Sequence, residues 1–338
     1  MIPIQNIRIE ENVYHVLLRL LHQKTGIEFK YYRKKFIEGR IKARMIRIPC
    51  YTLEEYYDYL FSHEDEINRF IESFNINYTH FFRDWSVFKK LQELFLISLG
   101  YKINAFSNII KPRAAKLRKF QTEANYKKNL KKKKAKPYDP FQRDVLSVVN
   151  PLSLYRKIKG PRSQKNRINI WSAPCASGEE PYSIAMMLDF LKKKISNFPK
   201  YKIVASDIDK ETLKLAKKGK YSHFSMKEIP DRFENDYFTK EKIHFGHNYY
   251  LKPEIINDIE FIEEDITKGH AKNIKYDIIF CRYLLIYFNR KRRHEFLDVL
   301  MNQLNSGGLL ILGKTEILME HETSLVFIDD KNQIYLKP

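Results

Sequence analysis

The sequence predicts an α/β protein with a doubly wound, mostly parallel sheet, preceded by a small all-α domain. Two observations lead to this prediction. After residue 167, short runs rich in β-branched and aromatic residues alternate with helical patterns, as in sheets that helices cover on both faces. The first 75 residues instead carry apolar side chains at helical spacing.

Four helices are expected in the N-terminal helical domain, residues 1–75. Apolar residues recur at helical spacing in 13–21, 36–41 and 67–74. Between the second and third of these stretches, Thr52 and Glu55 have the spacing of a capping box, which predicts the start of another helix.

Two segments separate this domain from the α/β part. Residues 76–98 are interpreted as a linker that also contacts a ligand, and residues 99–167 as a Lys-rich insertion. Residues 101–167 hold 20 Lys and Arg against three acidic residues, a balance of +17 within the net charge of +20. The basic character therefore belongs to one segment, which is too charged to join a packed core.

The α/β domain is expected over residues 168–338. Strands are predicted at 168–173, 201–206, 259–262, 276–281 and 308–313, with a last pair at 325–328 and 334–336. One helix is expected to begin at Pro181 and another to run through Leu213.

Charged residues follow three of the predicted strands. The first strand runs into SAPCASGEE, the second ends at Asp207, and 276–281 is followed by Arg282. Ligands of open α/β sheets bind outside the carboxyl ends of the strands, and a carboxylate there can accept hydrogen bonds from ribose hydroxyls. The first turn lacks GxGxxG, and its two carboxylates would repel a pyrophosphate but favour a cation such as S-adenosylmethionine.

Several classes of protein are not indicated. Cys50, Cys175 and Cys281 show neither a zinc-ligand spacing nor an even count, so no metal site or disulfide framework is expected. The start of the chain lacks a signal-peptide pattern, and no apolar run approaches the length that spans a bilayer. We therefore expect a soluble, cytoplasmic protein.

Several motifs resemble those of the CheR-type glutamate O-methyltransferases, which modify chemoreceptors (methyl-accepting chemotaxis proteins). They are WSAPCASGEEPYSIAM (171–186), NYTHFFRD (77–84), ASDID (205–209), CRYLLIYF (281–288), GGLLILGKTE (307–316) and GIEFKYYRKKFIEGRIKAR (26–44). The resemblance implies an enzyme of the S-adenosylmethionine-dependent methyltransferase fold that forms glutamyl methyl esters in chemotaxis signal transduction. It also implies a small β-subdomain at about residues 238–260.

The resemblance also implies a site, residue by residue. The cofactor-binding positions are Asn77, Thr79, Arg83, Glu180, Asp207, Asp265, Ile266, Arg282 and Tyr283. Arg83 and Tyr287 are the candidate catalytic residues. Glu180 is expected to face the cationic cofactor, whereas Glu179 is expected to serve the turn or the helix N-terminus.

Two positions depart from the family pattern. Asp265 stands where the family commonly has Asn, and it can still accept a hydrogen bond from the adenine amino group. Tyr283 stands where the CRN motif has Asn, so a phenol fills space or removes a contact beside the cofactor. Cofactor affinity and activity are the properties that this second change puts in question.

The partners follow from the resemblance and from charge. The cytoplasmic domain of a chemoreceptor is the expected substrate, and Lys35, Arg40 and Arg44 are expected on the solvent face of their helix, where they match basic docking positions. A receptor C-terminal tether peptide would bind the β-subdomain, and the insertion would approach an anionic membrane surface or act only as a linker. We expect a monomer.

Two alternative interpretations remain. One is a non-catalytic S-adenosylmethionine-binding regulator, which the change at Tyr283 would favour. The other is a nucleic-acid methyltransferase, which the basic insertion would suit, although no NPPY-like segment or stacking platform accompanies it.

Overall fold

The computed structural model describes residues 9–25, 28–48, 50–74, 79–99, 167–195, 198–244, 246–269, 274–318 and 324–338. Asn77 and residues 100–166, most of the basic insertion, lie outside this described part. The chain divides into two units: Met1–Tyr78 with Leu284–Phe296, and Thr79–Tyr283 with Leu297–Pro338.

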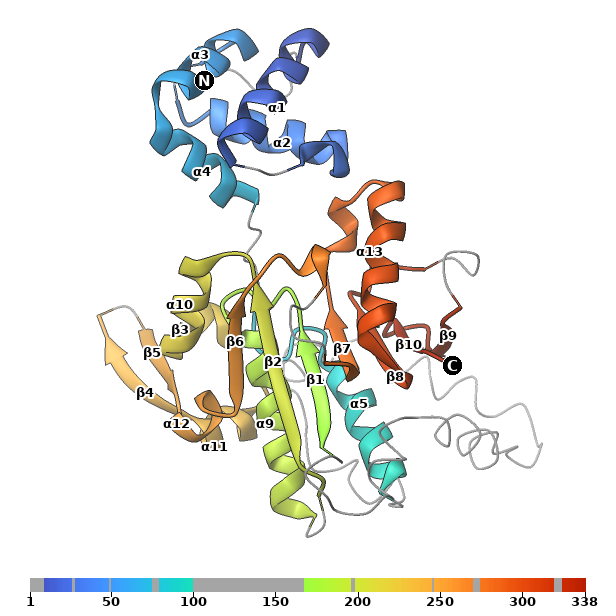
Figure 1. The fold of residues 1–338 in the computed structure, drawn as a ribbon. Coiled ribbons are helices and arrows are strands. Elements are labelled where there is room, and N and C mark those ends of the chain that lie inside the picture. Colours follow the sequence, from blue (N-terminus) through green and yellow to red (C-terminus); the bar gives the residue numbers. More distant parts are fainter. Residues whose placement is uncertain are drawn as a thin grey trace, which may run out of the picture. The chain divides into compact units, whose positions relative to one another are not determined.

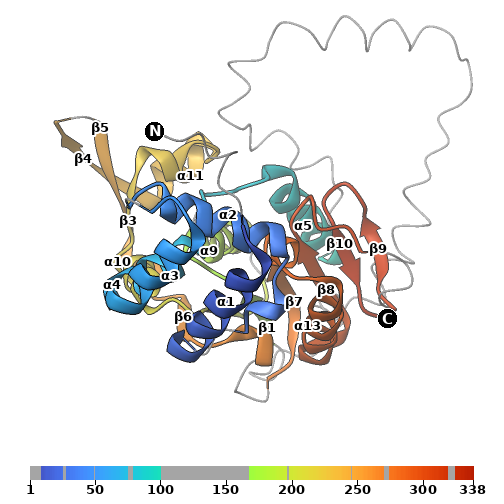
Figure 2. The same cartoon turned by 90° about the horizontal axis from the view of Figure 1, so that it is seen from above.

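The first unit contains the four expected helices, grouped together in Figure 2. They are α1 (Glu11–Thr25), α2 (Lys34–Met45), α3 (Leu53–Ser62) and α4 (Glu64–Phe74), with the short 3₁₀ helix η2 (Phe29–Tyr31) before α2. The predicted capping box is confirmed: Thr52 accepts the Glu55 N–H, and the Glu55 carboxylate accepts the Thr52 N–H. Buried side chains from all four helices form one core.

One predicted surface residue of α2 is buried. The Arg44 guanidinium donates to both carboxylate oxygens of Glu66 on α4, at 2.8 and 2.5 Å. The expectation that Arg44 lies on the solvent face is therefore wrong. The reason is helical geometry, because Arg44 follows Ile37 and Ile41 at i+7 and i+3 and shares their buried stripe. Lys35 remains exposed.

Residues 284–296 also belong to the first unit, a contribution that the sequence analysis did not include. Tyr32 and Phe288 form an antiparallel bridge. The Arg33 N–H donates to the Tyr287 carbonyl, and the Asn289 N–H donates to the Tyr31 carbonyl, both at 2.9 Å. This segment contains η8 (Leu285–Tyr287) and the first turns of α13 (Arg290–Gln303).

The second unit is built on a seven-stranded sheet with the order β6-β2-β1-β7-β8-β10-β9, shown in Figure 1. Its strands are β1 (Ile168–Ser172), β2 (Tyr201–Asp207), β6 (Ile259–Glu263), β7 (Tyr276–Cys281), β8 (Leu304–Leu312), β9 (Val326–Asp329) and β10 (Ile334–Leu336). The first five strands in the sheet order pair in parallel, and β10 is antiparallel to both of its neighbours. The predicted fold class is confirmed.

Helices pack along this sheet, with α9 and α10 against β2 and β6. The described residues of this unit include α5 (Trp85–Ser98), α9 (Glu179–Lys194), α10 (Lys210–Lys218), α11 (Asp231–Tyr237), α12 (Pro253–Ile256) and the part of α13 from Leu297 onward, with 3₁₀ helices η6 (His223–Met226) and η7 (Ile266–Lys268). No helix of the described part of the chain combines the length and apolarity needed to cross a membrane.

A second, antiparallel sheet has the strand order β3-β5-β4. It consists of β3 (Lys220–Ser222), β4 (Phe238–Ile243) and β5 (Gly246–Leu251). In Figure 1 it lies to one side of the larger sheet. This sheet covers residues 238–243 and 246–251 of the segment predicted as a β-subdomain and adds β3, whereas the later part of that segment forms α12 and the start of β6 in the larger sheet.

Candidate functional site

The candidate site lies where three parallel strands end. Strands β2, β1 and β7 are neighbours, so their carboxyl ends meet at one edge of the sheet. Strand β2 ends at Asp207, β1 at Ser172 and β7 at Cys281. The sequence therefore delivers the turn 173–178, Asp207 and Arg282 to the same edge.

Hydrogen bonds join Asp207 to the turn after β1. Its Oδ2 accepts the Ala176 N–H at 2.8 Å, and its Oδ1 accepts the Asp209 N–H at 3.0 Å. The turn closes at Gly178 (φ +93°), where an added Cβ would come within 2.9 Å of the Tyr182 ring. Glycine is needed there both for the backbone angle and for the close packing.

The two adjacent glutamates of this turn have different partners. Glu179 is buried and accepts hydrogen bonds from the Ser177 hydroxyl at 2.7 Å and the Ser225 hydroxyl at 3.0 Å, contacts that support the turn as expected. Its burial raises the pKa of the carboxyl above its usual value. Glu180 accepts from the Ser172 hydroxyl at 2.8 Å and from Arg282 Nη1 at 3.1 Å.

Arg282 joins this turn to the segment before α5. Its side chain is 2% exposed and forms ion pairs with Glu180 and Asp84. Arg282 Nη2 also donates to the Arg83 carbonyl at 2.9 Å. A buried guanidinium requires such compensation, and the two carboxylates supply it.

Asp84 is the central residue that the sequence analysis missed. It adopts a left-handed conformation (φ +61°), and its carboxylate accepts from Arg282 and from the Tyr283 hydroxyl. Lys314 Nζ lies 3.6 Å from the other oxygen. Burial opposes ionisation, but the hydrogen bond from Tyr283 and the neighbouring cations hold the pKa of Asp84 below its usual value. A signal existed, because Asp84 ends the NYTHFFRD motif.

Tyr283 and Arg83 stack on each other. The Arg83 Cζ lies 3.6 Å from the centroid of the Tyr283 ring. Tyr283 is left-handed (φ +63°), and its N–H donates to Glu316 Oε2 at 2.6 Å. The structure therefore brings together four of the predicted site residues, Arg83, Glu180, Arg282 and Tyr283, with Asp207 joined through the turn.

The remaining predicted residues are placed separately. Asp265 caps η7, accepting the Thr267 N–H at 3.0 Å, and Ile266 is buried beside it. Thr79 is half-buried at the start of its described segment. Tyr287 belongs to the first unit, where its ring centroid lies 4.6 Å from that of Phe36.

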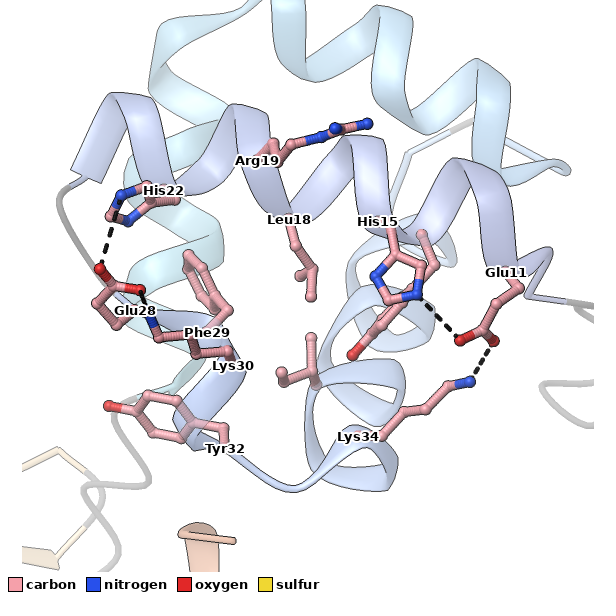
Figure 3. Close-up of a pocket in the computed structure, with 12 residues that line it drawn as sticks. Glu11, His15, Leu18, Arg19, His22, Glu28, Phe29, Lys30, Tyr32 and Lys34 are labelled. Atoms are coloured by element: carbon pink, nitrogen blue, oxygen red, sulfur yellow. Dashed lines mark hydrogen bonds and ion pairs between the residues drawn. The ribbon is translucent and has the colours of Figure 1, made fainter. Parts of the chain in front are cut away.

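A separate cavity of about 370 Å³ lies in the first unit (Figure 3). Its lining residues are Glu11, Tyr14, His15, Leu18, Arg19, His22, Glu28, Phe29, Lys30, Tyr32, Lys34 and Ile37. Glu11 and Glu28 each pair with one His and one Lys at opposite ends of the cavity. None of the predicted site residues lines it. Within the described residues, no group of three or more His, Cys, Asp and Glu could hold a metal ion.

Comparison with known proteins matches both units of the chain. The family model for the SAM-binding domain of CheR methyltransferase matches residues 147–334, and the model for the all-alpha domain of CheR methyltransferase matches residues 12–74. The chain belongs to the CheR methyltransferase family. It is therefore a methyltransferase, and S-adenosylmethionine is its cofactor.

Individual CheR relatives span different shares of the chain. Chemotaxis protein methyltransferase 2 of Vibrio cholerae is 27% identical over 87% of this chain and 82% of its own length. A chemotaxis protein methyltransferase of Borreliella burgdorferi is 24% identical over 93% of this chain and 90% of its own length. That of Listeria monocytogenes is 30% identical over 46% of this chain and 56% of its own length, about half of each.

The strand-end residues suit the cofactor of a CheR enzyme. Asp207 is 8% exposed, makes no ion pair within the described part of the chain, and has a pKa raised by burial. A carboxylate in this environment would be stabilised by donors such as ribose hydroxyls. Glu180, 11% exposed, is a second carboxylate at the same edge of the sheet, and Arg282 balances its charge. Asp207 is therefore the carboxylate whose surroundings fit a ligand with hydroxyl groups.

Proposed function

We propose that this protein transfers the methyl group of S-adenosylmethionine to glutamate side chains of chemoreceptors in the cytoplasm, forming glutamyl methyl esters. Membership of the CheR methyltransferase family supports the reaction. The observation that carries the proposal to particular residues is the meeting of three strand ends at one edge of the sheet. There Asp207 accepts the Ala176 N–H of the turn after β1, and Glu180, which follows the same turn, pairs with Arg282.

The residues of this edge have distinct binding roles in the proposal. Asp207 accepts hydrogen bonds from the two ribose hydroxyls, and Glu180 faces the positive charge of the cofactor. Asp265 and Ile266 hold the adenine, one by accepting from its amino group and the other by apolar contact. Thr79, before α5, is a further candidate, and Asn77 is proposed from the NYTHFFRD motif alone because it lies outside the described residues.

The chemistry needs orientation and not a general base. Bound S-adenosylmethionine supplies an electrophilic methyl group on a sulfonium. The receptor glutamate is ionised at neutral pH, so its carboxylate is already nucleophilic. Holding the reacting groups in place and excluding water can lower the barrier by about 7 to 11 kcal/mol. Arg83 would hold a carboxylate, and the CRYLLIYF motif makes Tyr287 the second candidate for a role in methyl transfer.

Docking is proposed through three surfaces. Lys35 and Arg40 of α2 would approach the acidic methylation region of the receptor, and Arg44 is excluded because it is buried against Glu66. A receptor tether peptide would bind the β3-β5-β4 sheet. The basic insertion would raise the rate at which the enzyme encounters an acidic receptor or an anionic membrane. We propose that the enzyme acts as a monomer.

A methyl-transfer assay tests the proposal. Labelled S-adenosylmethionine is incubated with receptor-rich membranes, and RNA and DNA serve as parallel substrates. We expect base-labile label on receptors only. Cofactor binding without transfer to any substrate would instead support a non-catalytic regulator, the alternative that the Tyr283 substitution favours. Label on nucleic acid would refute both.

A further inference from the structure

Tyr283 contacts neighbouring residues through its backbone, its hydroxyl and its ring face. Its backbone is fixed by Glu316 Oε2, which accepts both the Tyr283 N–H at 2.6 Å and the Gly313 N–H at 2.7 Å. An added Cβ at Gly313 would come within 2.9 Å of the Tyr283 ring, so glycine leaves the space that the ring uses. The left-handed backbone of Tyr283 is held by these contacts.

The phenol and the ring face have separate partners. The hydroxyl donates to Asp84, whose carboxylate is also held by Arg282 and approached by Lys314. Burial first, and then the hydrogen bond to Asp84, raise the pKa of the Tyr283 hydroxyl, so it stays a donor at neutral pH. The ring face meets the Arg83 guanidinium with Cζ 3.6 Å from the centroid.

Stacking leaves the chemistry of an arginine intact. A guanidinium stacks through its flat face, whereas its N–H groups donate in the plane of the group. A stacked arginine can therefore hold a carboxylate in a fixed orientation while the aromatic ring restricts the rotamers of its long side chain. A flexible arginine would lose more conformational entropy when it binds the same carboxylate.

We propose that Tyr283 is a positioning residue that orients Arg83 to bind a carboxylate, with Asp84 anchoring the phenol. This inference rests on the proposed function, where two carboxylates are present: that of the methionine moiety of the cofactor, and that of the receptor glutamate. Asparagine, the residue of the family motif, offers no ring face to Arg83, so Tyr283→Asn removes this support instead of improving the site.

Calorimetry with two ligands separates this role from a simple adenine contact. S-adenosylhomocysteine carries the amino-acid carboxylate, whereas methylthioadenosine shares the adenosine but lacks that carboxylate. If Arg83 holds the cofactor carboxylate, Tyr283→Leu should weaken S-adenosylhomocysteine binding by about five- to thirtyfold, the range of a partly desolvated cation–π contact. Methylthioadenosine binding should change less than about twofold.

The second arm concerns the receptor. If Arg83 holds the receptor glutamate, Tyr283→Leu should leave the affinities for S-adenosylhomocysteine and methylthioadenosine unchanged. The KM for receptor-rich membranes should instead rise by about five- to thirtyfold. Tyr283→Phe, which keeps the ring, should show a smaller effect than Tyr283→Leu in whichever arm responds. The matched control for calorimetry alone is Tyr250→Leu, because Tyr250 also has a cation over its ring and donates to a carboxylate, but in the β3-β5-β4 sheet, which is the proposed tether-binding surface. The affinity for S-adenosylhomocysteine should not change in this control.

Double variants provide the decisive comparison. In an Arg83→Ala background, Tyr283→Leu should cause no further change in the quantity that it altered in the unaltered background, whether that is the affinity for S-adenosylhomocysteine or the KM for receptor-rich membranes. Additive effects, equal loss of both adenosine ligands, or no effect in either arm would overturn the positioning role. Absence of S-adenosylhomocysteine binding by the unaltered, folded chain would overturn the proposed function itself. Circular dichroism confirms folding, and Tyr283→Phe keeps the packing if the leucine variant unfolds.

Discussion

Two aspartates at the end of β2 illustrate how position at the sheet edge decides the role of a residue. Asp209 caps α10, because its carboxylate accepts the Glu211 and Thr212 N–H groups at 3.0 and 3.1 Å. Asp207, two residues earlier, turns toward the loop after β1 and accepts the Ala176 N–H. The same residue type thus serves helix stability at one position and the candidate site at the other.

Replacing Asp207 separates these roles. We expect Asp207→Ala to weaken binding of S-adenosylmethionine and S-adenosylhomocysteine by about 1.5 to 3 kcal/mol, because charge-assisted hydrogen bonds to the ribose are lost. The control Asp209→Ala should cost about 1 kcal/mol of stability through its lost cap and leave affinity unchanged. Calorimetry and urea unfolding measure the two quantities. Unchanged affinity in folded Asp207→Ala would remove Asp207 from the site.

Asp84 should make stability depend on pH. Its pKa in the folded chain lies below the usual value, despite burial, because Tyr283 donates to it and Arg282, Lys314 and Arg83 are close. Such a group stabilises the fold above the unfolded pKa of about 4, and the stabilisation is lost as the pH falls through the lower folded pKa. Asp84→Asn should therefore be less stable than the unaltered chain at pH 7, with a smaller difference at pH 3.

The matched variant for this measurement is Asp236→Asn. Asp236 pairs with Arg232 on the exposed surface of α11, and exposed pairs contribute little. Urea midpoints at several pH values compare the variants. A difference between Asp84→Asn and the unaltered chain that stays constant with pH would show that the Asp84 charge does not stabilise the fold.

At the scale of elements, the ion pair between α2 and α4 should contribute strongly to the stability of the first unit. The side chains of Arg44 and Glu66 are 8% and 1% exposed, and the Tyr56 hydroxyl also donates to Glu66 at 3.1 Å. Glu66→Ala would leave a buried guanidinium without its carboxylate, which costs about 3 to 5 kcal/mol. Urea unfolding followed by far-UV circular dichroism measures the loss.

Glu64→Ala is the control on the same helix. Glu64 pairs with Lys24 at 3.3 Å, but its side chain is 85% exposed, so its loss should cost less than about 1 kcal/mol. Equal effects of the two substitutions would contradict the argument from burial.

At the scale of the whole molecule, the basic insertion provides a test of docking that leaves the cofactor site unchanged. The insertion contains a Lys-rich run from Lys127 to Lys136. We expect deletion of residues 125–137 to leave S-adenosylmethionine binding intact. Methylation of membrane-embedded receptors at low salt should slow, because long-range attraction to an acidic partner is lost. The difference should shrink as salt screens the charge, and equal rates throughout a salt series would leave only a linker role.

The fold class, and the edge of the sheet at which the candidate site lies, could be predicted from the sequence. Alternating strand and helix patterns after residue 167 predicted the parallel sheet, because a strand buried on both faces requires a continuous apolar run. The capping box at Thr52 and Glu55 predicted a helix start through local hydrogen bonds. Charged residues after strands predicted the binding edge, because parallel strands all end on the same side of the sheet.

The pairs of side chains that meet became visible in the folded chain. Tyr283 and Asp84 are 199 positions apart, and Arg44 and Glu66 are 22 apart on different helices. Periodicity assigns a residue to a face of its own element but does not identify the residue opposite. For this reason the sequence did not reveal that Asp84 meets Tyr283. Arg44 was misassigned to the surface because of its charge, although its spacing from Ile37 and Ile41 places it on their buried stripe. The packed fold pairs this buried charge with Glu66, because an unpaired one would be too costly.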